Sequence, residues 1–94
     1  MKFAAIIEYG DTEKVKALHP VHREYLRRFL ENRQLRAAGP FAADEGALWV
    51  LEAETAEAAE EIVRGDPYVE AGAIVSWQIR PLSYWSAQQA RGSR

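Results

Sequence analysis

The chain contains no cysteine, so it can form neither a disulfide nor a thiolate metal site. This absence is compatible with a reducing compartment, and we expect the protein to be cytoplasmic. No apolar stretch approaches the roughly 20 residues that a membrane-spanning helix needs. The apolar run at the N-terminus reaches Glu8 too early for a signal peptide. The sequence therefore predicts a protein with no membrane partner.

A strong excess of one charge is also missing, because the formal net charge is -2 at pH 7. Domains that bind nucleic acid usually gather a basic excess on one face, whereas here Arg and Lys are interleaved with Glu. The chain has no Gly-rich phosphate loop, no dinucleotide fingerprint and no serine nucleophile elbow. We therefore expect no nucleic-acid partner, no cofactor and no serine chemistry.

What the sequence does contain is an alternation of strand and helix patterns. Strands are predicted at residues 2–9, 35–42, 47–53 and 73–80, and helices at residues 20–33 and 55–64. Pro20 suits the first position of a helix, so residues 11–18 are interpreted as a polar connection before it, with room for one turn of helix. Gly39-Pro40 interrupts the second strand, which indicates an edge, a bulge or a strand end.

This order of elements, βαββαβ, predicts a ferredoxin-like α+β fold. Such a fold has one antiparallel sheet with both helices on one face. Apolar side chains remain on the other face, and pairing two sheets would bury them. The sequence therefore predicts a homodimer of the dimeric α+β barrel type. We assign residues 1–82 to the domain and residues 83–94 to a C-terminal tail.

His22 has an unusual position for a titratable residue. It lies within an apolar stripe of the predicted helix that comprises Leu18, Val21, Tyr25, Leu26, Phe29 and Leu30. An imidazole facing inward needs a hydrogen-bond partner, because an unpaired buried polar group costs about 1–3 kcal/mol. One interpretation is a core histidine with a satisfied hydrogen bond. The other is a general acid or base at the edge of a pocket, for which imidazole is well suited near neutral pH.

Asp66 is the carboxylate best placed to serve His22. It follows Gly65, which ends the second helix, and it precedes Pro67. Its simpler role is to cap the turn that follows. Its alternative role is to accept the N–H of His22 and orient the ring, as carboxylates do for catalytic histidines. Both predicted helices lie on one sheet face, so the two residues can be at the same end of the molecule.

Other residues have weaker claims to a site. His19 is interpreted as a solvent-side residue. His19 and His22 could together bind a metal ion, but no third ligand residue follows at a spacing typical of a metal site, so no metal site is predicted. Gly39 and Pro40 either only shape the backbone at this point or direct the end of the strand toward a ligand. The aromatic side chains that belong either to the core or to a pocket are Trp49, Tyr68, Tyr84 and Trp85.

Three segments together resemble the YciI-like (YCII-related) family. They are HPVHREYLRRFLENRQLRAAGPF, AAEEIVRGDPYVEAG and WQIRP, and the resemblance spans residues 1–82. The ordered combination of a helix His, Gly-Pro and Asp-Pro-Tyr carries it. The sequence departs from the family pattern at His19, where the family often has Arg, and in a short segment between Phe41 and Gly46.

The resemblance implies a ferredoxin-like dimer with a His–Asp pair at its active site, which maps onto His22 and Asp66. We expect substrate contacts from Gly39, Pro40 and Tyr68, and the proposed proton transfer needs no cofactor. Some relatives remove chloride from chlorinated hydroxyquinols, and muconolactone isomerase shares the fold. We therefore expect a lyase or isomerase acting on an aromatic or lactone compound. The alternative is a non-catalytic ligand-binding or accessory dimer with a structural His–Asp hydrogen bond.

Overall fold

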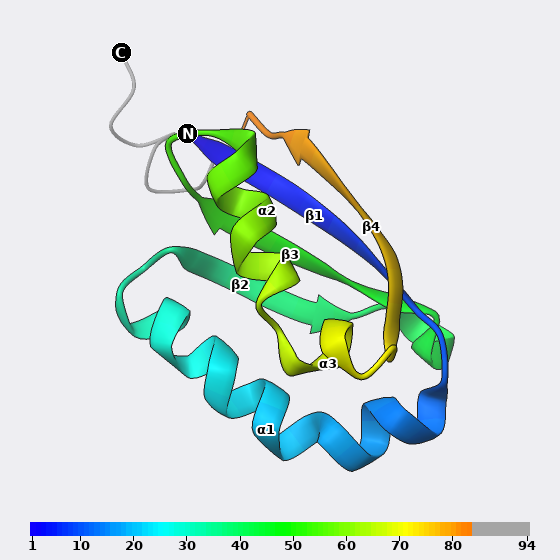
Figure 1. The fold of residues 1–94 in the computed structure, drawn as a ribbon. Coiled ribbons are helices and arrows are strands. Elements are labelled where there is room, and N and C mark those ends of the chain that lie inside the picture. The colour runs from blue at the N-terminus through cyan, green and yellow to red at the C-terminus, as the bar shows by residue number, and fades with distance from the viewer. Residues whose placement is uncertain (84–94) are drawn as a thin grey trace.

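One antiparallel sheet runs through the computed structural model, which describes residues 1–83. Its strands are β1 (Lys2–Tyr9), β2 (Leu35–Pro40), β3 (Gly46–Glu52) and β4 (Ile74–Pro81). They lie in the order β2-β3-β1-β4, so the first and third strands are central (Figure 1). Along β1 the buried residues Phe3, Ala5 and Ile7 alternate with more exposed ones. One face of the sheet therefore forms the core.

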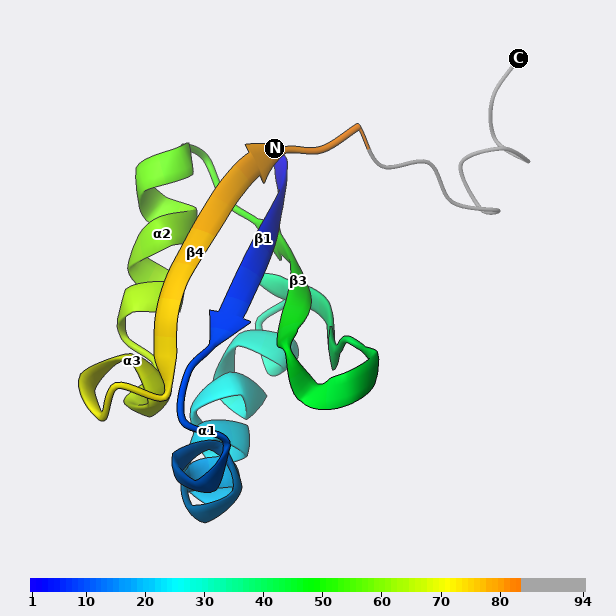
Figure 2. The same ribbon diagram turned by 90° about the vertical axis from the view of Figure 1, so that its right-hand side faces the viewer.

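The helices all pack on that face. They are α1 (Thr12–Glu31), α2 (Ala56–Arg64) and α3 (Pro67–Glu70); a short 3₁₀ helix, η1 (Ala42–Asp44), lies apart from them in the connection between β2 and β3. Contacts join α1 to β2 and α3, and α2 to β1 and β4. In Figure 2 the view along the sheet places α2 and α3 on one side of it. None of the helices within residues 1–83 is long and apolar enough to cross a membrane.

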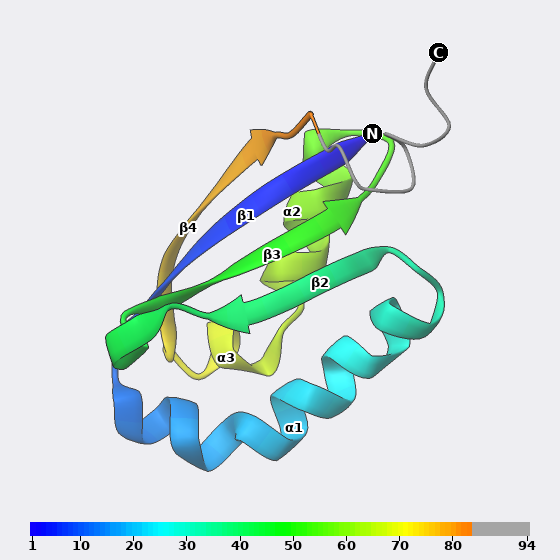
Figure 3. The same cartoon turned by 180° about the vertical axis from the view of Figure 1, so that it is seen from behind.

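The opposite face of the sheet carries no α-helix within the described residues (Figure 3). This arrangement confirms the predicted ferredoxin-like α+β fold. The predicted C-terminal tail at residues 83–94 lies, apart from its first residue, outside the described part of the chain.

The second helix matches the prediction closely. Thr55 caps α2, because its hydroxyl oxygen accepts the backbone N–H of Ala58 at 3.1 Å. Its inward face, formed by Ala59, Ile62 and Val63, is buried against the sheet, as the apolar spacing predicts.

The first helix begins eight residues earlier than predicted. Asp11 caps it, with its carboxylate accepting two backbone N–H groups of the first turn. Residues 11–18 are therefore not a polar connection, and Pro20 lies inside the helix. A proline there removes one helical hydrogen bond. The apolar stripe nevertheless continues N-terminally through Val15 and Leu18, which pack on the core and hold the helix together.

The inward stripe of α1 is also narrower than predicted. Val21 is 53% exposed and Leu30 is 49% exposed, so neither belongs to the core. Both residues lie at the margins of the predicted stripe, where the curved helix surface turns away from the sheet. His22 and Leu26 are the buried residues of α1.

The Gly39-Pro40 interruption has the predicted consequences. β2 is an edge strand and it ends at Pro40; a separate irregularity in its pairing with β3 lies between Leu35 and Ala37, before the Gly-Pro pair. An edge strand tolerates a residue without a donor N–H because one side of its backbone has no partner strand.

Glu52 at the end of β3 provides a first test of the fold. Its carboxylate accepts the N-terminal ammonium at 2.9 Å and pairs with Lys2 at 3.0 Å, and these bonds lower the pKa of Glu52 below its ordinary value of 4.5. The ionised form therefore stabilises the fold above pH 4.5, and this contribution is lost as the pH falls through the lowered pKa. We expect Glu52→Gln to cost less than about 1 kcal/mol at neutral pH, because solvent screens the pairs.

Thermal unfolding of Glu52→Gln and the wild type across a series of pH values checks this expectation. The difference should disappear at strongly acidic pH, where the wild-type carboxyl is protonated in both states. A difference that stays constant from neutral to acidic pH would contradict the assigned ion pairs.

Candidate functional site

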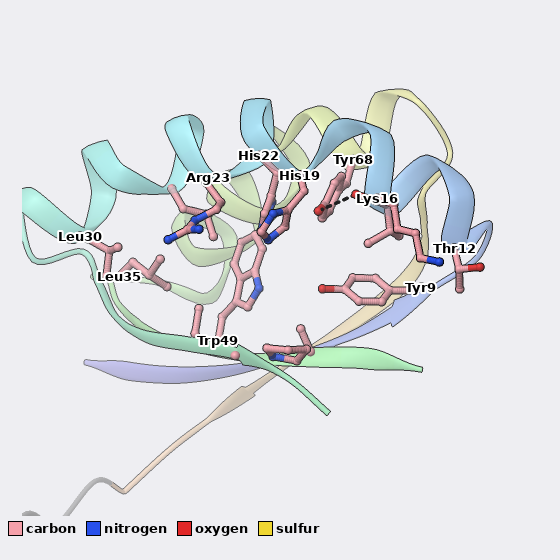
Figure 4. Close-up of a pocket in the computed structure, with 16 residues that line it drawn as sticks. Tyr9, Thr12, Lys16, His19, His22, Arg23, Leu30, Leu35, Trp49 and Tyr68 are labelled. Atoms are coloured by element: carbon pink, nitrogen blue, oxygen red, sulfur yellow. Dashed lines mark hydrogen bonds between the residues drawn. The ribbon is translucent and has the colours of Figure 1, made fainter. Parts of the chain in front are cut away.

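A cavity of about 710 Å³ opens between α1 and the sheet. Helix α1 supplies one wall, and β2 and β3 supply the other, with Leu35, Ala47 and Trp49 among the lining residues (Figure 4). Its size falls within the range of about 300–1,000 Å³ typical of small-molecule sites. The cavity is therefore large enough for a ligand of one or two rings.

His22 lies at the inner end of this cavity. The residue is 8% exposed, and its ring faces away from solvent because it belongs to the inward stripe of α1. Its Nδ1 lies 2.6 Å from Oδ2 of Asp66, whose side chain is fully buried. The structure thus brings together two residues that are 44 positions apart in the sequence.

Asp66 combines the two roles that the sequence left open. Its Oδ1 accepts the backbone N–H of Tyr68 at 2.9 Å, which caps α3, while its Oδ2 faces His22. The Gly-Asp-Pro-Tyr segment is therefore a capped short helix and not a simple turn. Because both oxygens have partners, the carboxylate cannot rotate without losing a buried hydrogen bond.

Tyr68 packs flat against one face of the His22 imidazole. Its ring stacks on that of His22 with centroids 4.0 Å apart and an interplanar angle of 8°. Its hydroxyl donates to the carbonyl oxygen of Val15 at 3.0 Å. Burial, with added repulsion from Tyr9 and Asp66, raises the pKa of Tyr68 to about 12. The hydroxyl therefore remains a neutral donor at ordinary pH and holds the ring in place.

These contacts determine which ring nitrogen of His22 carries the proton. A carboxylate only accepts hydrogen bonds, so Nδ1 carries the proton and Nε2 keeps its lone pair in the neutral ring. Nε2 has no hydrogen bond within the described residues, and every fully buried side-chain nitrogen or oxygen there has a partner. Nε2 is therefore open to the cavity, where it can accept a proton.

Tyr25 and Gly65 set the distance between α1 and the end of α2. The Tyr25 hydroxyl donates to the carbonyl oxygen of Ile62 at 2.8 Å, and a Cβ at Gly65 would collide with that hydroxyl. Burial, and secondarily the negative charge of Asp66, raises the pKa of Tyr25. Glycine at position 65 thus allows α1 to approach closely enough for His22 to reach Asp66.

Gly39 and Pro40, predicted as substrate contacts, line the cavity from β2. Trp49 lines it from β3, with its ring centroid 6.1 Å from that of His22. Tyr84 and Trp85 lie outside the described residues. Within residues 1–83, no three His, Asp or Glu side chains are grouped as a metal site would require.

Among the cavity residues that the sequence prediction missed are Tyr9, Lys16 and Arg23, and it placed His19 only on the solvent side. His19 is indeed exposed, but it also lines the cavity. Recognising Asp11 as the cap of α1 would have revealed the cavity residues of the helix, because the spacing of Lys16, His19 and Arg23 then places them on one face.

Comparison with known proteins identifies a family, one related sequence and one solved structure of the same fold. The sequence profile of the YCII-related domain matches residues 1–83. The uncharacterized protein YjpA of Bacillus subtilis (strain 168) is 35% identical over 74 residues, which cover 73% of this chain and 87% of YjpA. Among solved structures, 5-chloro-2-hydroxyhydroquinone dehydrochlorinase (TftG) from Burkholderia phenoliruptrix AC1100, in complex with 2,5-dihydroxybenzoquinone, superimposes with a TM-score of 0.78. It is 17% identical, and the match covers 90% of this chain and 96% of TftG, which shows a shared fold.

Proposed function

The chain belongs to the YCII-related domain family, and we propose that it is a small-molecule enzyme of lyase or isomerase type. His22 moves a proton, and Asp66 orients the ring. The observation that carries the proposal is the Nδ1–Oδ2 hydrogen bond of 2.6 Å behind an imidazole that borders a cavity. A carboxylate in this position selects the tautomer and stabilises the imidazolium that forms during proton transfer.

In the proposed reaction, Nε2 of His22 takes a proton from a carbon next to a carbonyl group. The electrons of that C–H bond move toward the carbonyl oxygen and give an enolate. An isomerase then returns the proton from Nε2 to a different carbon. A lyase instead expels a leaving anion from the neighbouring carbon, and the proton departs with it. Neither route needs an oxidant or a reductant, and a positioned acid–base group typically contributes about 10²–10⁴-fold to the rate.

Two observations support an aromatic or lactone ligand. The cavity has a flat apolar element in Trp49, and Tyr9 lies along its edge (Figure 4). TftG, which shares the fold, acts on a chlorinated hydroxyhydroquinone and binds a dihydroxybenzoquinone. A planar ring carrying oxygen substituents fits both the cavity and this comparison.

Deuterium exchange tests the proposal without knowledge of the natural substrate. The protein is mixed in D₂O with 2,5-dihydroxybenzoquinone, whose ring hydrogens can exchange through the keto tautomer that places them next to carbonyl groups, or with a small unsaturated lactone. Loss of the C–H signal is followed by NMR. We expect exchange clearly above the buffer rate with at least one of these compounds. Binding of the compounds without any acceleration of exchange would favour the alternative, in which the His–Asp bond is structural and the protein only binds its ligand.

We also propose that the protein is a homodimer that pairs through the uncovered face of the sheet. On this face Ile6 and Leu48 are exposed, large and apolar, and they lie opposite each other on β1 and β3. Ala4 and Val50 form the next cross-strand pair. We call these four residues the outer patch. A second copy of the chain would cover the outer patch across a two-fold axis.

Replacing Leu48 with Arg tests the dimer. The introduced charge would be desolvated in the interface but solvated in a monomer, so we expect the variant to shift from twice the chain mass of 10.6 kDa to that mass. Size-exclusion chromatography with light scattering measures the change. Val21→Arg is the matched control, because Val21 is an exposed apolar residue of α1 away from the outer patch. A wild-type monomer, or a Leu48→Arg dimer, would overturn this proposal.

A further inference from the structure

Charge is unevenly distributed around helix α1. Three side chains spaced by three and four residues line the cavity and can carry positive charge, namely Lys16, His19 and Arg23. Taking about 100° per residue, they lie within about 60° of one another. Glutamates of the same helix lie about a quarter turn further round, away from the cavity, at Glu13, Glu24 and Glu31. The helix therefore presents three of its basic side chains, and none of its acidic ones, to the cavity.

Lys16 and Arg23 are available to a ligand. Neither takes part in an ion pair within residues 1–83, whereas Arg27, on the same helix but outside the cavity, pairs with Glu24 at 3.4 Å. No Asp or Glu is among the described residues that line the cavity. The carboxylate of Asp66, which contacts the His22 ring, is fully buried and is not among the lining residues. The positive charge of this wall is thus not neutralised by the protein.

The wall opposite these cations is apolar. β2 and β3 contribute Leu35, Ala47 and Trp49. Figure 4 shows Lys16 and Arg23 on either side of the two histidines, with Trp49 across the cavity from them. A ligand that fills the cavity therefore meets cations along one edge and an apolar surface along the other.

We infer that the ligand is an anion, specifically a planar aromatic or conjugated carboxylate, with its carboxylate held by Lys16 and Arg23 and its ring against Trp49. The inference rests on the proposed use of this cavity as the ligand site. Arg binds carboxylates through a planar pair of donors, and Lys adds a compact charge. His19, between them, lines the same wall. This arrangement leaves Nε2 of His22 facing the ring and not the carboxylate.

A matched pair of probes tests the inference. 2,5-Dihydroxybenzoate and 2,5-dihydroxybenzamide have nearly the same shape but differ by one negative charge. Dissociation constants are measured by NMR titration or calorimetry at low ionic strength. We expect the benzoate to bind at least about tenfold more tightly than the amide. This preference should shrink severalfold when salt is raised from about 0.02 M to about 0.5 M, because screening weakens the ionic contacts.

Variants identify the residues responsible. In the double variant Lys16→Gln/Arg23→Gln the preference for the benzoate should fall to about twofold or less. Arg27→Gln, which removes a cation of α1 outside the cavity, should retain it. Equal binding of benzoate and amide by the wild type, an unchanged preference in the double variant, or an equal loss in Arg27→Gln would each overturn the inference. Lys16 and Arg23 are both exposed, so the double variant is expected to fold. The salt series tests the ionic contacts in the wild type and does not depend on any variant.

The inference and the proposed function can fail separately. His22→Gln should keep the preference for the benzoate, because His22 is assigned to proton transfer and not to binding the carboxylate. If deuterium exchange is absent but the preference depends on Lys16 and Arg23, the anion site stands and the enzyme proposal falls. If exchange proceeds but the wild type shows no preference for the benzoate, the enzyme proposal stands and the anion site falls.

Discussion

Replacing His22 with Gln is expected to reduce protein-catalysed deuterium exchange by about 10²–10⁴-fold, the usual contribution of a positioned base. Gln is neutral and cannot take up a proton near neutral pH, yet it can still present a polar group to Asp66 across the 2.6 Å contact seen for His22. The variant should therefore stay folded, as judged by circular dichroism, while the exchange rate of a bound quinone or lactone falls toward the buffer rate.

Asp66→Asn tests whether the tautomer of His22 matters for exchange. The Asn oxygen can still accept the Tyr68 N–H, but its amide would donate to Nδ1 of His22 and leave the ring proton on Nε2. The cavity would then face a donor in place of a base, so the loss of exchange should approach that of His22→Gln. Arg27→Gln, which lies outside the cavity, is the control and should exchange at the wild-type rate. Full exchange in both the His22 and Asp66 variants would rule out the proposed mechanism.

Replacing Asp66 with Ala is expected to lower the free energy of unfolding by about 3 kcal/mol. The substitution leaves two buried donors, the N–H of Tyr68 and Nδ1 of His22, without their acceptor, and each such loss costs about 1–3 kcal/mol. For a domain of this length the change corresponds to a fall in Tm of about 15 °C. Thermal and urea unfolding at equal protein concentrations measure it, since association would also affect Tm.

Asp11→Ala provides the matched control for this stability test. Asp11 also caps a helix, but it is exposed and has no histidine partner, so its loss should cost only about 1 kcal/mol. The excess cost at Asp66 then measures the buried bond to His22. If the two alanine variants are equally stable, the His22–Asp66 contact contributes nothing to the fold, and the buried network described above is wrong.

Several parts of the site could be predicted from local sequence. The apolar spacing around His22 placed its ring inward, and Gly65 and Pro67 marked Asp66 as the residue that follows the second helix and caps the next turn. The order of elements then put both on one face of the sheet. Their hydrogen bond could not be derived, because it joins residues 44 positions apart and depends on how closely α1 packs against the end of α2. Gly65 and Tyr25 set that distance through a tertiary contact.

The start of α1 shows why the rest of the site was missed. A proline usually marks the first turn of a helix, and this rule moved the predicted start from Thr12 to Pro20. The error placed Lys16 in a loop and removed it from the face that it shares with Arg23. Asp11 and the apolar pair Val15 and Leu18 are the competing signals, and tertiary packing of that pair outweighs the missing hydrogen bond at Pro20.

The protonation of the His22 ring tests the account most directly. Long-range ¹H–¹⁵N correlation spectra of the ¹⁵N-labelled protein distinguish a protonated ring nitrogen from one that carries a lone pair. With the ring neutral, we predict a protonated Nδ1 and a bare Nε2, and the Nε2 signal should move when 2,5-dihydroxybenzoquinone is added. A proton on Nε2, or an Nε2 signal that ignores every ligand shown to bind in the cavity, would contradict the assignment of His22 as the base.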